Sequence, residues 1–129
     1  MRRTALWALV ICGLATAHDA VAADPAPNLV GTWSGGGLGV GKQDGWADDP
    51  VTLVITEQRE RAFTGKKTHS EGEEGFFGAI LADGRSLLLT DDGDGYSVGS
   101  ILDTDSIEVC YVEAGADAQV FCRTLKRRP

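Results

Sequence analysis

Few side chains of this sequence could do chemistry. Beyond residue 23 there is one histidine, His69, followed closely by the carboxylates of Glu71, Glu73 and Glu74. A closed zinc site needs four His, Cys or carboxylate ligands, and nucleophilic catalysis needs a base beside the nucleophile. One histidine and two cysteines that we expect to be oxidised provide neither arrangement. We therefore predict no catalytic residues, no metal and no cofactor, and interpret the acidic stretch as a charged, solvated edge.

Three short motifs resemble functional loops but lack the context that each needs. Residues 36–42 match most of a phosphate-binding loop, yet Gln43 replaces the Ser or Thr that holds magnesium. Residues 95–99 fit G-x-S-x-G, which acts only on a strand-to-helix turn, whereas Ser97 falls within a predicted strand. Residues 91–95 resemble a calcium loop, but the bidentate glutamate position is Ile101. We interpret all three as turns and strands.

The elements around these motifs are short strands. No stretch beyond residue 23 has a helical period, and short Val-, Ile-, Leu- and Phe-rich runs alternate with Asp-Gly, Gly-Asp or Thr-Asp turns. These runs predict strands at 29–34, 51–57, 62–68, 75–81, 86–91, 96–102, 107–112 and 118–126. Eight sequential strands favour an all-β fold, an eight-stranded antiparallel up-and-down β-barrel, with a two-sheet β-sandwich as the alternative.

One connection is long. Residues 35–50 contain six glycines together with Leu38, Val40 and Trp46. Long segments without regular structure in small domains are commonly functional or disordered. We expect 35–50 to be a mobile loop over the barrel mouth and its apolar side chains to contact a ligand.

The last two strands predict a disulfide. If 107–112 and 118–126 form a hairpin centred on Ala116, Cys110 lies opposite Cys122, as Tyr111 lies opposite Phe121. The alternation then places the cysteines on the outer face of the barrel wall. Two buried free thiols are the alternative.

The first 23 residues predict a cleaved signal peptide. Arg2 and Arg3 precede a short apolar run, and small residues at 20–23 precede a polar segment with prolines. Cleavage leaves 24–28 as a flexible N-terminal segment and 29–129 as one domain in the periplasm or outside the cell, where disulfides form. It removes two arginines and one aspartate from a chain of net charge −7, and so leaves −8. This acidity disfavours nucleic acid as a partner, and no later segment is long and apolar enough for membrane insertion.

A first strand carrying Gly31-Thr32-Trp33, followed by a meander, resembles the calycin barrels, which include lipocalins and avidins. That resemblance implies that Trp33 packs across the barrel base, and we also include it as a candidate binding residue. The chain also resembles an uncharacterised family of small exported bacterial β-barrel proteins, and this resemblance implies no known activity. It rests on four segments: Gly31 to Gly35, Phe63 to Gly65, Asp92 to Tyr96 and Glu108 to Tyr111.

The function that we expect is an exported, non-enzymatic binding module for a small apolar or amphipathic molecule at the barrel mouth. The alternative is a module that binds an exported protein, such as an inhibitor of a secreted protease. In that case the flexible segment 24–28 would enter the protease. A third possibility is an enzyme whose catalytic groups converge from different strands and leave no sequence motif.

Overall fold

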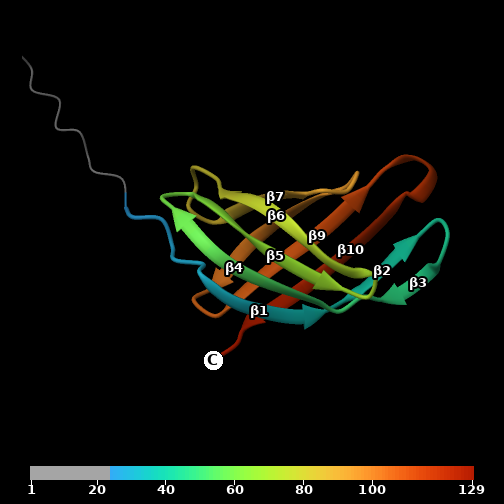
Figure 1. The fold of residues 1–129 in the computed structure, drawn as a ribbon, viewed down its shortest axis with the longest axis horizontal. Coiled ribbons are helices and arrows are strands. Elements are labelled where there is room, and N and C mark those ends of the chain that lie inside the picture. Colours follow the sequence, from blue (N-terminus) through green and yellow to red (C-terminus); the bar gives the residue numbers. More distant parts are fainter. Residues whose placement is uncertain (1–23) are drawn as a thin grey trace, which may run out of the picture.

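The computed structural model describes residues 24–129, so the predicted signal peptide lies outside the described residues. These residues form one antiparallel sheet that closes into a barrel (Figure 1). The elements are β1(Gly31–Gly36), β2(Leu38–Gly41), β3(Gly45–Asp48), β4(Val51–Arg59), β5(Ala62–His69), β6(Gly72–Ile80), β7(Ser86–Asp91), β8(Tyr96–Asp103), β9(Ser106–Glu113), a 3₁₀ turn η1(Gly115–Asp117) and β10(Gln119–Arg127).

The barrel closes because β1 pairs with β4 on one side and with β10 on the other. From β4 to β10 each strand pairs with the next along the chain, as the short turns require. The predicted eight-stranded meander barrel is confirmed, and the two-sheet sandwich is wrong. Each predicted strand overlaps an observed one.

The base of the barrel is a packed apolar core. Trp33 is fully buried there with Leu29, Ile80, Ile107 and Leu125. Its indole Nε1 donates a hydrogen bond to the Leu29 carbonyl at 2.8 Å, and the Arg127 guanidinium lies 4.1 Å from its ring centroid. Trp33 therefore packs across the base, as the calycin resemblance implied.

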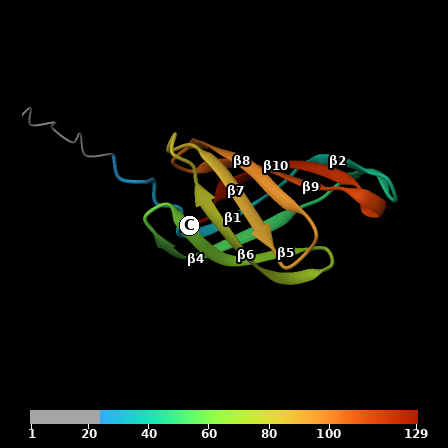
Figure 2. The same ribbon diagram turned by 90° about the horizontal axis from the view of Figure 1, so that it is seen from above.

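The segment 35–50 is a correction to the sequence prediction, because it forms the hairpin β2–β3 rather than an irregular loop. Strand β2 continues along β10 beyond β1 (Figure 2), and β3 pairs with β2 (Figure 1). The glycines serve close packing: a Cβ at Gly39 would lie 2.1 Å from the Phe121 ring, and one at Gly37 would lie 2.0 Å from the Cys122 carbonyl oxygen. Glycine here permits close contact between chain segments, whereas the prediction of a mobile loop rests on the flexibility of glycine.

The hairpin β9–β10 has the predicted register. Cys110 pairs with Cys122 and forms the disulfide, with Cα atoms 3.9 Å apart. Ile107, Val109 and Phe121 point into the barrel and are buried. The disulfide therefore lies on the outer wall, as expected.

Candidate functional site

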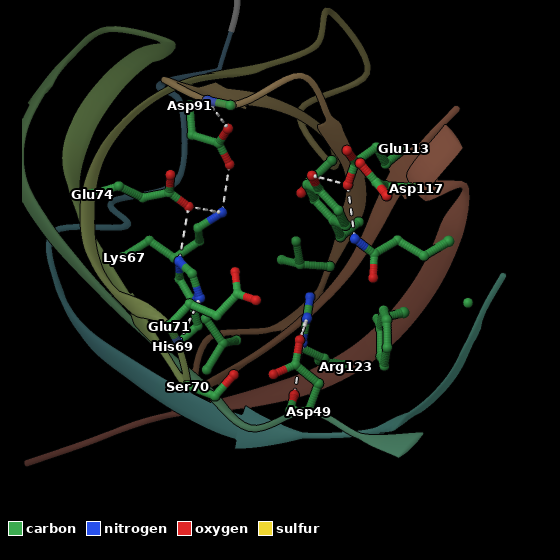
Figure 3. Close-up of a pocket in the computed structure, with 18 of the residues that line it drawn as sticks. Asp49, Lys67, His69, Ser70, Glu71, Glu74, Asp91, Glu113, Asp117 and Arg123 are labelled. Atoms are coloured by element: carbon green, nitrogen blue, oxygen red, sulfur yellow. Dashed lines mark hydrogen bonds and ion pairs between the residues drawn. The ribbon is translucent and has the colours of Figure 1, made fainter. Parts of the chain in front are cut away.

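A cavity of about 630 Å³ opens at the end of the barrel opposite Trp33. This end holds the β2–β3 hairpin and the β5–β6, β7–β8 and β9–β10 connections. Its apolar floor consists of core side chains, namely Val51, Leu53, Phe76, Leu89, Val109 and Phe121. Above this floor, charged side chains line two facing walls (Figure 3).

The first wall is built on β5, β6 and the end of β7. Lys67 Nζ lies 2.6 Å from Glu74 Oε1 and also forms an ion pair with Asp91. His69 Nε2 lies 3.1 Å from the same Glu74 oxygen. The Asp91 side chain is only 7% exposed, so its charge depends on Lys67 for compensation.

The second wall centres on Arg123 of β10. Its guanidinium forms an ion pair with the Asp49 carboxylate, and Nε donates to the Asp49 carbonyl at 2.8 Å. The Arg123 side chain is 8% exposed and its guanidinium lies 5.3 Å from the Phe121 ring centroid. Asp49 follows β3 directly, so this pair fixes the end of the β2–β3 hairpin to the barrel.

Tyr111 completes the second wall. Its hydroxyl donates to Glu113 Oε2 at 3.0 Å, and Gln119 Nε2 donates to the same oxygen at 2.7 Å. Burial of the phenol and its hydrogen bond to Glu113 raise the pKa of Tyr111 well above its ordinary value. Tyr111 therefore stays a neutral hydrogen-bond donor, and its ring lies 5.3 Å from Lys67 Nζ.

The cavity lining is strongly acidic. It includes nine carboxylates but only three basic side chains, those of Lys42, Lys67 and Arg123. Two of these bases are already paired with carboxylates. Within residues 24–129, five of the lining carboxylates take part in no side-chain hydrogen bond or ion pair: Asp44, Asp48, Glu71, Asp94 and Asp117. The cavity thus combines an apolar floor with an excess of negative charge at its rim.

None of the four predicted binding residues lines this cavity. Leu38 and Trp46 are 64% and 75% exposed, while Val40, the cross-strand partner of Trp46, is half-buried. Trp33 is buried at the base. The apolar hairpin side chains therefore face outward, because Gly39 and Ala47, which alternate with them, hold the inward positions. Their role in binding stays a prediction.

The N-terminal segment makes contacts with the barrel. Ala26 packs against the core, and Gln58 Nε2 donates to the Pro27 carbonyl at 2.8 Å. Arg127 donates to the Asn28 carbonyl at 2.8 Å. These contacts hold the end of the 24–28 segment, and no observation in the described residues favours its insertion into a protease.

In the part of the chain that the structure describes, no three His, Cys, Asp or Glu side chains are placed to hold a metal ion. Over the same residues, no helix has the length and apolarity needed to cross a bilayer.

The residues that form the two walls are not among the binding residues predicted from the sequence. The acidic stretch around His69 and Glu74 is typical of a solvated edge, but in the structure His69 and Lys67 point inward from β5, on the same face as buried Phe63. Arg123 likewise lies between Phe121 and Leu125 on the inward phase of β10. A charged residue that alternates with apolar, inward-facing residues along a predicted strand is the sequence feature that could have identified these positions.

Comparisons with known proteins provide no family for this chain. No protein-family model matches it, and searches of curated proteins and of solved structures find no significant match.

Proposed function

We propose that the chain is a binding module whose barrel mouth holds a small amphipathic molecule with a positively charged group. The observation that carries this proposal is the 630 Å³ cavity with an apolar floor and an acidic rim. A cavity of this size can enclose a small molecule, and apolar pockets with a few placed polar groups are typical of ligand sites.

The carboxylates of the cavity lining favour a ligand with a positive charge. A carboxylate ligand would face a lining with an excess of negative charge, whereas an ammonium or guanidinium group would compensate it. The apolar part of the ligand would lie on Leu53, Phe76 and Leu89. The Tyr111 ring beside Lys67 offers a face on which a second cation could also stack.

We further propose that the protein works after export. The disulfide between Cys110 and Cys122 fits an oxidising compartment, and the signal-like sequence of residues 1–23 supports the same assignment.

The test is a calorimetric titration with two ligands of equal chain length, octylammonium and octanoate. We expect octylammonium to bind and octanoate to bind at least about tenfold more weakly, because only the first compensates the rim. The double variant Glu71→Gln and Asp117→Asn should weaken octylammonium about fivefold. Glu108→Gln, an exposed change on the outer wall, is the matched control and should have no effect. Equal binding of both ligands, or of neither, would contradict the proposal.

A further inference from the structure

The barrel has one strand edge that is not paired. The sheet order ends at β3, which pairs only with β2. Every barrel strand has a neighbour on both sides over at least part of its length, so among the described strands β3 alone has a whole edge without a partner. Such edges are templates for the addition of an extended chain.

The register shows which backbone groups of β3 are free. Asp49 N–H donates to the Gly37 carbonyl, which makes Leu38 and Asp48 a non-hydrogen-bonded pair. Because backbone orientation alternates along a strand, the N–H and C=O groups of Trp46 and Asp48 point away from β2. In the described part of the chain, these four groups make no hydrogen bond.

This free edge borders the cavity. Ala47 and Asp48 line it from β3, while His69 lines it from the end of β5 and Ser70 and Glu71 from the β5–β6 connection. A strand added to β3 would therefore point alternate side chains into the cavity, on the side of Ala47. The side chains in between would lie on the outer face beside Trp46, which is 75% exposed.

The two sides of such an added strand would meet different chemistry. On the cavity side, the unpaired carboxylates Glu71 and Asp117 favour a basic side chain. On the outer side, Trp46 with its partner Val40 favours an apolar one. A second copy of this chain fits poorly, because antiparallel pairing of two β3 strands centred on Trp46 would place Asp44 of one copy opposite Asp48 of the other.

We propose that the free edge of β3 binds an extended peptide segment with alternating basic and apolar residues by strand addition. The basic side chain enters the cavity and the apolar one packs beside Trp46. The inference rests on the proposed function, since the cavity that accepts the basic side chain is the site assigned above. It names the ligand class as a segment of a basic protein or peptide.

The experiment is an NMR titration of the folded protein with the capped peptide acetyl-Val-Lys-Val-Lys-Val-amide, followed at the amides of Trp46 and Asp48. We expect saturable shifts at both amides and loss of binding by at least about tenfold when Glu replaces Lys. Two further peptides carry N-methyl groups on one or the other alternate set of amides. Strand addition requires that one set abolishes binding and the other does not, because only one set faces β3.

A variant of the protein gives the matching control. Asp48→Pro removes one free N–H from the edge and is compared with Asp48→Asn, which loses the same carboxylate but keeps the N–H. The peptide should bind Asp48→Pro about tenfold more weakly than Asp48→Asn, while octylammonium binds the two variants equally. Equal binding by both N-methylated peptides would overturn the inference, as would self-association through β3 without peptide binding. If octylammonium binds and the peptide does not, this inference fails and the proposed function stands. If neither binds, both fail.

Discussion

The two ends of this barrel differ in what fills them. At the base, Trp33 and its apolar neighbours exclude water. The Arg127 guanidinium lies over the indole and donates hydrogen bonds to the Val30 and Asn28 carbonyls. At the mouth, the inward positions hold Lys67 and Arg123, and a cavity remains. The same strands therefore carry stability at one end and an acidic, partly open site at the other.

The difference between the base and the mouth follows from the energetics of burying apolar and charged groups. Apolar burial at the base stabilises the fold by about 25 cal/mol per Å². At the mouth, the attraction between paired charges does little more than offset the free-energy cost of removing them from water, so these pairs contribute little net stability. Charged residues that lie in a barrel interior with little stabilising effect are candidates for function.

The largest expected effect comes from breaking the base. Trp33→Ala should destabilise the protein by about 3–5 kcal/mol, because it leaves a large cavity and removes the Arg127 contact. Trp33→Phe keeps most of the volume but loses the indole hydrogen bond, and should cost about 1–2 kcal/mol. Denaturant unfolding measures both. Similar values for Trp33→Ala and an exposed change such as Trp46→Ala would contradict the structural role of the base.

Removal of the disulfide should have the next largest effect on stability. The double change Cys110→Ala and Cys122→Ala opens a link between residues 12 apart and should cost about 3 kcal/mol at most. Because the disulfide lies on the outer wall, octylammonium affinity should stay the same. A thermal melt and a calorimetric titration of the same sample test this, and lost affinity in a folded variant would show that the cysteines shape the mouth.

A change at the mouth should separate binding from stability. Lys67→Met leaves Glu74 and Asp91 without their cation and should cost about 2 kcal/mol at neutral pH. The affinity for octylammonium should rise, because the variant frees two carboxylates for the ligand. Weaker binding by Lys67→Met would mean that this lysine itself contacts the ligand.

The smallest effect is expected at a turn near the base. Asp83 accepts hydrogen bonds from the Ser86 hydroxyl and from the Ser86 and Arg85 amides, which lower its pKa to about 2. Its pKa in the unfolded chain is higher, so this contribution is full above about pH 4 and is lost as the pH falls towards 2. Asp83→Asn should lower the melting temperature slightly at pH 6 and not at pH 2. A side-chain NMR titration of Asp83 checks the cause directly.

Sequence alone could predict the barrel, its strand positions and the disulfide register. These follow from alternation with period two and from short polar turns, both of which are local signals. The β2–β3 hairpin was beyond such reasoning, because the reason for Gly37 and Gly39 is contact with β10, some 80 residues later. The mouth was also missed, since Lys67, Asp91 and Arg123 lie on strands far apart in sequence and meet only once the barrel closes.

The central claim is that ligand binding belongs to the mouth and stability to the base. An NMR titration of the folded protein with octylammonium tests it most directly, by mapping which amide and indole signals shift. The account predicts saturable shifts at His69, Tyr111 and Arg123, and none at the Trp33 indole or Leu125. Shifts confined to Leu38 and Trp46 on the outer hairpin, or to the base, would contradict it.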